Sequence, residues 1–392
     1  MVNMKDLLNH AYKNRYAVGA FEIVSLEFLH AVLDAAEKNR SPVILNIVET
    51  HFALFDVETL LVAVVHAANR ASIPVCVQMD HCSSMATVET AIRLGCNGVM
   101  YDNANDDFTV NVGNTREAVS LAHACGITVE GEIGVVTGIT SEPSNNKADP
   151  ENVSFTSVNE AKLYVERTSV DFLAVSVGTV HGRSKNKARL DYTRLAQIRD
   201  SVSIPLVIHG GTGLSDHQYH KLIDHGVAKI NYFTALKEQA TRQIKSNMKK
   251  PGANYSGLFK NVSQGVSAEV ERCMQAWGCA GRAAEVMLQC ATWRTAKRIV
   301  VYNTHSDDPG LIRKMLVEGK QQLSVIPGVL CVEHGESVDT HGKYTYCWVI
   351  RFASEKAIRN FQSDPGQINF TRQYLTPNAD QIITRDYELR AE

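Results

Sequence analysis

From the N-terminus to about Leu288, the chain alternates apolar runs with helical patterns. The runs are nearly continuous and rich in Val, Ile and Leu, which is typical of parallel strands that helices cover on both faces. Eight such strands, each followed by a helix, predict an α/β fold, the (β/α)8 TIM barrel with right-handed crossovers. The predicted strands are residues 16–23, 42–49, 74–80, 98–103, 128–134, 172–178, 205–210 and 228–233.

The pattern changes after about Thr295. From there the order is strand, helix, two strands, helix and strand, which is that of a small ferredoxin-like α+β unit. We therefore expect a barrel over residues 1–290 and a second, separately folded domain over residues 296–392. The predicted elements of this second domain are residues 298–305, 307–326, 327–338, 343–354, 355–365 and 379–389.

Three of the predicted barrel strands run into a histidine. His81 follows PVCVQMD, His181 follows VGTV, and His209 lies in PLVIHGG. The carboxyl ends of barrel strands converge on one face, so these histidines can meet although they are distant in sequence. A single histidine at a strand end is more often structural, but three in this context predict a zinc site with one position left for substrate.

Composition excludes several classes of partner. The formal net charge of the 392 residues is −2, and no apolar run has the length of a membrane span, so we expect neither a nucleic acid nor a membrane as partner. The nine cysteines form no CxxC pair, which favours reduced thiols. The first 14 residues have an amphipathic pattern unlike a signal peptide, and we expect a cytoplasmic protein.

The barrel segment resembles the class II, zinc-dependent ketose-bisphosphate aldolases, which act on fructose or tagatose bisphosphates. Beyond residue 296 the chain resembles the Dabb (stress-responsive α/β-barrel) domains. The likeness of the barrel rests on VGAF (18–21), SPVIL (41–45), MDH (79–81), GEIG (131–134), VGTVHG (177–182), HGGTG (209–213), GVAKIN (226–231) and AGRA (280–283). That of the tail rests on IPGV (326–329), Gly335, Tyr346, FAS (352–354) and DY (386–387).

The resemblance implies an aldolase, a carbon–carbon lyase of carbohydrate metabolism. It would cleave a ketose 1-phosphate or ketose bisphosphate to dihydroxyacetone phosphate and an aldehyde, with Zn²⁺ bound by His81, His181 and His209. Asp80 matches the family's proton-transferring aspartate, although a carboxylate there could also support a ligand histidine. Asn231 matches the asparagine whose amide steadies the enediolate oxygen.

Other matches concern metal and phosphate. Glu132 and Asp102 match acidic residues that hold the metal in a second position or bind another cation, and Asp102 could equally be an ordinary loop carboxylate. HGGTG would bind the substrate phosphate through backbone N–H groups, and a monovalent cation (Na⁺ or K⁺) would fit there. The matching phosphate-site residues are Gly182, Lys185, Gly210, Gly211, Thr212 and Thr234. The Dabb-like tail implies a homo-oligomer, either a dimer or a tetramer.

The sequence departs from the family mostly where the aldehyde half of the substrate would lie. Glu22 replaces a usual asparagine, and Lys237 replaces an arginine that often reaches a neighbouring subunit's substrate. Val48, Phe233 and Ala235 also differ from the family pattern. These changes predict that fructose 1,6-bisphosphate is a poor substrate, unless they are only packing changes.

Residues 137–153 are polar and Pro/Asn-rich, and we expect a mobile loop over the active face. The family's loop glutamate is missing from it, unless Glu142 takes its place. Two other functions stay open at this stage. One is a non-catalytic sugar-phosphate-binding or assembly protein. The other is a related metal-dependent lyase or isomerase on a different substrate, for example a carboxylated one for which Lys237 could serve as counter-ion.

Overall fold

The computed structural model describes residues 1–134, 155–180, 182, 189–305, 308–339 and 341–389. Eight parallel strands close into a barrel in the order of the sequence, with β8 pairing back onto β1, as the alternating pattern predicts. Almost every strand residue is buried, because the inner face fills the barrel and the outer face lies under helices. The strands are β1 (Val18–Glu22), β2 (Val43–Val48), β3 (Val75–Cys82), β4 (Gly98–Tyr101), β5 (Thr128–Ile133), β6 (Phe172–Val175), β7 (Leu206–Ile208) and β8 (Val227–Tyr232).

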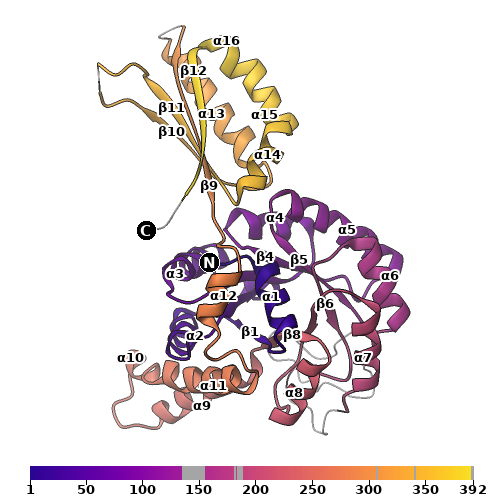
Figure 1. The fold of residues 1–392 in the computed structure, drawn as a ribbon. Helices are drawn as coiled ribbons and strands as arrows, with labels where there is room; N and C mark the ends of the chain where they lie inside the picture. The colour runs from indigo at the N-terminus through magenta and orange to yellow at the C-terminus, as the bar shows by residue number, and fades with distance from the viewer. Residues whose placement is uncertain (135–154, 181, 183–188, 306–307, 340, 390–392) are drawn as a thin grey trace.

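A ring of helices surrounds the strands (Figure 1). Several begin at a serine or aspartate whose side chain accepts a hydrogen bond from the first turn, among them Ser25, Asp56, Ser84 and Ser215. The helices are α1 (Met4–Lys13), α2 (Leu26–Lys38), α3 (Val57–Arg70), α4 (Met85–Arg93), α5 (Phe108–Ala124), α6 (Val158–Thr168), α7 (Tyr192–Ser201), α8 (Asp216–Asp224), α9 (Thr234–Met248), α10 (Tyr255–Leu258), α11 (Val262–Ala276) and α12 (Ala283–Gln289). A 3₁₀-helix, η1 (Glu49–Ala53), comes directly after β2.

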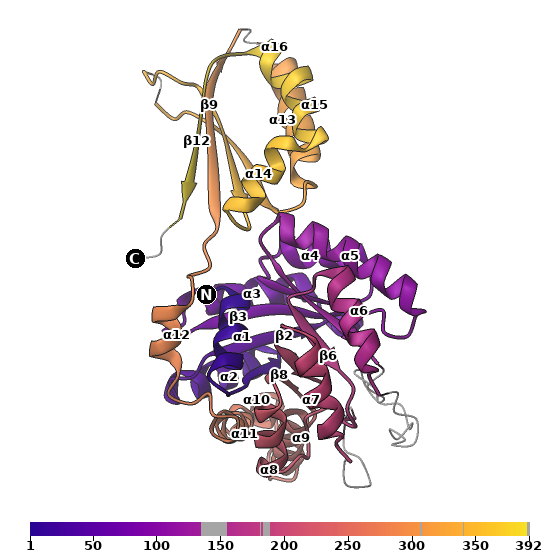
Figure 2. The same cartoon turned by 45° about the vertical axis from the view of Figure 1, so that its right-hand side comes forward.

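The C-terminal residues form a four-stranded antiparallel sheet in the order β10-β11-β9-β12, with helices on one face (Figure 2). This is the ferredoxin-like arrangement expected from the sequence. Residues 366–378, for which the sequence made no prediction, add further helical turns. The elements are β9 (Ala296–Thr304), α13 (Pro309–Ser324), β10 (Val329–Glu336), β11 (Tyr346–Phe352), α14 (Glu355–Ser363), α15 (Pro365–Phe370), a π-helical turn (Thr371–Leu375), α16 (Thr376–Asn378) and β12 (Ala379–Glu388).

The C-terminal domain packs at the N-terminal ends of the barrel strands. β10 contacts α4, and α14 contacts α5. The Ser354 hydroxyl donates a hydrogen bond of 2.6 Å to the Cys125 carbonyl, just before β5 begins. Figures 1 and 2 show the domain beside the barrel next to α4 and α5. Because His81 and His209 lie at the carboxyl ends of their strands, these histidines and the domain of one chain are at opposite ends of the barrel.

Among the described helices, none is both long and apolar enough to cross a membrane. All nine cysteines are free thiols, and seven of them are buried.

Candidate active site

The first two site residues, Asp80 and His81, lie at the carboxyl end of β3, just before its last residue. The chain turns sharply there, because His81 adopts a left-handed backbone conformation with φ of 51°. Few residues other than glycine take up this conformation, and strain of this kind is concentrated at functional sites. The turn brings Asp80, which is 2% exposed, and His81 to the same pocket.

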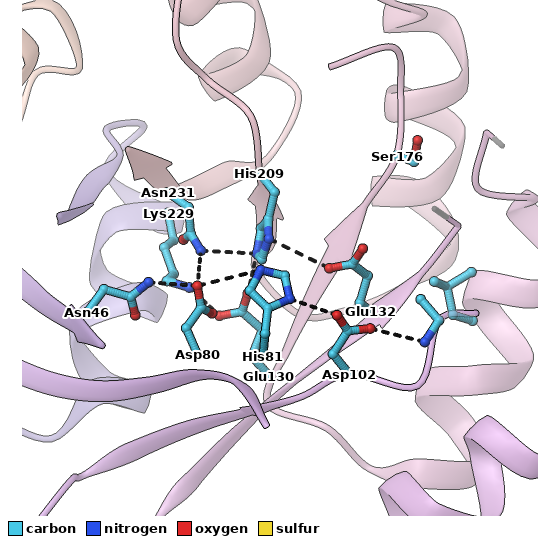
Figure 3. A network of polar contacts seen from close by, with 12 residues as sticks. Asn46, Asp80, His81, Asp102, Glu130, Glu132, Ser176, His209, Lys229 and Asn231 are labelled. Carbon is cyan, nitrogen blue, oxygen red and sulfur yellow. Dashed lines mark hydrogen bonds and ion pairs between the residues drawn. The ribbon is translucent and has the colours of Figure 1, made fainter. Parts of the chain in front are cut away.

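His209 comes directly after β7 and meets His81 at the centre of the site. The two ring centroids lie 4.9 Å apart. His81 Nδ1 lies 2.7 Å from an Asp102 carboxylate oxygen, so its other nitrogen, Nε2, is the one that faces Asp80 (Figure 3). A histidine held through one nitrogen by a carboxylate is oriented as metal-ligating histidines are.

Two amides hold Asp80. Asn46 Nδ2 on β2 donates a hydrogen bond of 2.7 Å to Asp80 Oδ2, and Asn231 Nδ2 on β8 donates one of 2.8 Å to the same oxygen (Figure 3). Asp80 Oδ1 is buried and has no hydrogen-bond partner within the described part of the chain. The carboxylate is therefore fixed in orientation while one oxygen stays available to another group.

Beneath the pocket, Glu130 and Lys229 form a completely buried ion pair, with Lys229 Nζ 2.6 Å from Glu130 Oε2. Gln78 Nε2 donates to the same oxygen at 2.9 Å, and His209 Nε2 lies 3.1 Å from Glu130 Oε1. Burial opposes ionisation of Glu130, but Lys229 and His209 hold the pKa of this carboxyl below its ordinary value. The pair thus supports His209 from below.

Two more carboxylates flank the histidines. Glu132 Oε2 lies 3.6 Å from His209 Nδ1, is buried and has no hydrogen-bond partner among the described residues. Burial and the neighbouring Asp102 raise the pKa of Glu132 to about 7. Burial lowers the pKa of His81, but Asp80 and Asp102 outweigh it and raise that pKa to about 10. Both raised pKa values reflect the carboxyl groups crowded into this buried space. A bound cation would offset their negative charge.

The donor set fits a divalent metal ion. Ligand atoms of Asp80, His81 and His209 lie within 4.8 Å of one another, and so do those of His81, Asp102 and Glu132. Imidazole nitrogens with flanking carboxylates are a zinc-type donor set. The third expected ligand, His181, and the expected Lys185 lie outside the described residues, as does the 137–153 loop with Glu142.

The pocket above these residues includes the expected phosphate loop. Gly210 and Gly211 follow His209 directly, and Gly210 has a positive φ of 69°, which suits a residue without a side chain. A Cβ atom on Gly211 would come within 2.9 Å of Ile230. The pocket is lined by Glu22, Asn46, Val48, Asp80, His81, Gly182, Gly210, Gly211, Thr212, Asn231, Tyr232, Phe233 and Thr234.

The structure thus brings together all the described site residues that the sequence predicts. It places Lys237 beside its own chain's Phe233, with the ammonium 5.4 Å from the ring centroid. Sequence reasoning missed Gln78, Glu130, Lys229 and His51. The first three lie two positions before a predicted site residue on the same strand, which is a signal that could have found them.

Comparisons with known proteins show the families of the two parts of the chain. The family model described as "Fructose-bisphosphate aldolase class-II" matches residues 2–282, and the Dabb model, "Stress responsive A/B Barrel Domain", matches residues 296–389. A fructose-bisphosphate aldolase of Geobacillus stearothermophilus is 34% identical over 291 residues, covering 73% of this chain and 99% of that protein. A sulfofructosephosphate aldolase of Alkalicoccus urumqiensis is 31% identical over 271 residues, covering 69% and 93%.

Among solved structures, the YdjI aldolase from Escherichia coli K12 superposes with a TM-score of 0.64 at 31% sequence identity. The match covers 72% of this chain and 99% of that one.

Proposed function

Because this chain belongs to the class II fructose-bisphosphate aldolase family and carries a C-terminal Dabb domain, we propose that it cleaves a ketose 1-phosphate or ketose bisphosphate to dihydroxyacetone phosphate and an aldehyde. The observation that supports this most is Asp80. Its carboxylate is held by Asn46 and Asn231 next to the two histidines, in a pocket that also contains the glycine loop. A protein that only bound sugar phosphates would not need a buried acid–base group there.

We propose His81, His209 and His181 as the ligands of a zinc ion, with Glu132 and Asp102 near it. When bound, zinc would polarise the substrate carbonyl. Asp102 keeps the His81 ring in place through Nδ1, and Glu130 does the same for His209. A monovalent cation beside the phosphate stays a prediction.

The chain's own residues would carry the proton and the charge. Asp80 would take the proton from the C4 hydroxyl in cleavage and return it in synthesis. The Asn231 amide would donate to the oxygen on which charge develops. Backbone N–H groups of Gly210, Gly211 and Thr212 would hold the phosphate, with Gly182, Lys185 and Thr234 around it.

The direct test is release of dihydroxyacetone phosphate by the purified protein from a panel of ketose phosphates, measured with a coupled enzyme. Release from at least one ketose phosphate is expected, and none at all would contradict the proposal. If only those substrates that carry a carboxylate are cleaved, the result favours the related metal-dependent lyase over the aldolase.

Zinc binding can be tested at His209. His209→Ala should lose bound zinc, because a buried ligand disappears and alanine offers no donor in its place; zinc per chain by mass spectrometry measures this. Acidification should also release the metal, since protonated imidazole cannot bind it. His220→Ala removes an exposed histidine on α8 and is the matched control. Full zinc content in His209→Ala would exclude the site.

We further propose that residues 1–290 form the catalytic domain and that residues 296–392 join chains into a homo-oligomer. The sheet face opposite the helices carries apolar side chains in register, with Val301 paired to both Cys347 and Ile383, and Ile299 paired to Val349. Ile383 is 38% exposed and Tyr387 is 50% exposed in the single chain. Apolar area of this kind favours a partner.

Deleting residues 296–392 should therefore lower the oligomeric state, measured by light scattering, while zinc stays bound. Val301→Lys in the full chain should act in the same direction, because it places a charge in the middle of the apolar face. If both proteins keep the native number of chains per particle, the barrel alone makes the interface.

A further inference from the structure

Glu22 forms part of the pocket wall on the side of β1 and β2. It is the last residue of β1 and is only 7% exposed, yet it lines the same pocket as Asp80 and Asn46. Its Oε1 atom is buried and makes no well-aligned hydrogen bond among the described residues, although His51 Nδ1 lies 3.3 Å from it. Burying an acceptor without a well-aligned donor costs free energy, so this position favours a ligand that can donate a hydrogen bond.

His51 lies directly behind Glu22. It belongs to η1, is 2% exposed, and its Nδ1 lies 3.3 Å from Glu22 Oε1. The His51 ring packs against Phe55 and Phe233, with centroids 5.9 and 5.7 Å away. These contacts fix the imidazole, and the imidazole in turn restrains the Glu22 carboxyl group.

The surroundings of Glu22 are unfavourable for a second phosphate. Burial and the neighbouring Asp80 raise the pKa of Glu22 well above its ordinary value, although His81 and Lys237 oppose this. A phosphate dianion would have to share a low-dielectric space with these two carboxyl groups. The Lys237 ammonium lies against the Phe233 ring. Val48 and Phe233, which also line the pocket, are apolar and suit the uncharged carbon chain of a substrate.

We propose that Glu22, positioned by His51, accepts a hydrogen bond from a hydroxyl group on the aldehyde half of the substrate. The site thereby selects ketose 1-phosphates whose aldehyde half is hydroxylated and uncharged. This inference rests on the proposed aldolase function and adds the substrate class to it. Glu22 is thus a binding residue, and His51 is a positioning residue.

The test runs the reaction in the direction of synthesis, with dihydroxyacetone phosphate and three acceptor aldehydes of the same carbon number. Glyceraldehyde has the hydroxyls and no charge, propanal lacks the hydroxyls, and glyceraldehyde 3-phosphate adds the second phosphate. For the unmodified protein we expect kcat/KM for glyceraldehyde to exceed that for propanal by about 100-fold, since a site built to bind a hydroxyl rejects the analogue without it. We expect glyceraldehyde 3-phosphate to be at least about 10-fold poorer than glyceraldehyde.

Two substitutions separate charge from hydrogen bonding. Glu22→Gln keeps an acceptor but removes the ionisable carboxyl group, so the preference for glyceraldehyde over its phosphate should fall by about 10-fold or more. Glu22→Leu removes the acceptor, so the preference for glyceraldehyde over propanal should nearly vanish. Glu58→Gln removes an exposed carboxylate on α3 and should leave both ratios unchanged.

The role of His51 has its own readout. His51→Leu should lower the glyceraldehyde-to-propanal ratio mainly through KM for glyceraldehyde, while kcat with propanal and the zinc content stay at the native level. His51→Gln, which can still donate to Glu22, should restore part of the ratio. A merely structural His51 would instead lower activity with all acceptors equally.

The outcomes separate the aldolase function from the role of Glu22. If no acceptor consumes dihydroxyacetone phosphate, the aldolase function and this inference both fail. If acceptors react but glyceraldehyde 3-phosphate is the best of them, or if the Glu22 variants leave both ratios unchanged, the aldolase function stands and the inference about Glu22 is wrong.

Discussion

Asp80→Ala should lower the rate of carbon–carbon cleavage by about 10²- to 10⁴-fold, the usual contribution of a positioned acid–base group, while the protein folds and keeps its zinc. The loss should appear in kcat, because the carboxylate acts on the proton of the reacting hydroxyl and is not needed to bind the phosphate. Steady-state kinetics together with zinc content measures it. Native turnover in Asp80→Ala would assign Asp80 to structure only.

Two further variants distinguish a loss of acid–base catalysis from a loss of packing or of metal binding. Asp80→Asn keeps the volume, so a similar loss of kcat there would exclude a packing effect. Asp102→Asn instead disturbs the carboxylate that holds His81 Nδ1, and a change of this type weakens metal binding by about 10- to 100-fold. Activity in that variant should recover with added zinc, whereas Asp80→Ala should not respond.

The second large effect concerns stability. Lys229→Met should lower the free energy of unfolding by about 3–5 kcal/mol, because it leaves the Glu130 carboxylate buried without its cation. Gln78 and His209 remain near Glu130, but neither carries a fixed positive charge. The midpoint of urea denaturation, monitored by circular dichroism, measures the loss.

A double variant separates charge from packing. In Lys229→Met/Glu130→Leu the unpaired carboxylate is gone, so much of the lost stability should return. Arg93→Met, which breaks the exposed pair with Glu58, should change the midpoint little. An unchanged midpoint in Lys229→Met would mean that Glu130 is protonated in the folded protein.

The barrel could be predicted because its strands are buried on both faces. That burial demands apolar, β-branched runs, and each of the eight runs in the sequence is a strand in the structure. The small sheet was predictable for another reason: β9 and β11 alternate in burial, since helices cover only one of their faces. Strand ends were less certain. β7 stops at Ile208, and His209 already belongs to the loop.

The sequence pointed to His81 and His209 because each lies at, or just past, the carboxyl end of an apolar strand. The buried ion pair beneath the pocket was missed, because Glu130 and Lys229, each considered alone, look like charged interruptions of an apolar strand pattern. Side chains two positions apart point to the same side of a strand, so Glu130 lies under Glu132, and Lys229 lies under Asn231. His51 gave no comparable sign, because it lies on a short 3₁₀-helix whose position depends on the packing of Phe55 and Phe233.

At His81, the requirements of folding stability and of catalytic activity favour different residues. A non-glycine residue with φ of 51° costs the folded state on the order of 1 kcal/mol, and glycine would relieve most of it. Selection for stability alone would therefore replace this histidine, and only selection for activity keeps it. A laboratory evolution experiment that rewards heat resistance without catalysis should lose His81 early, before the packed residues of the barrel interior change.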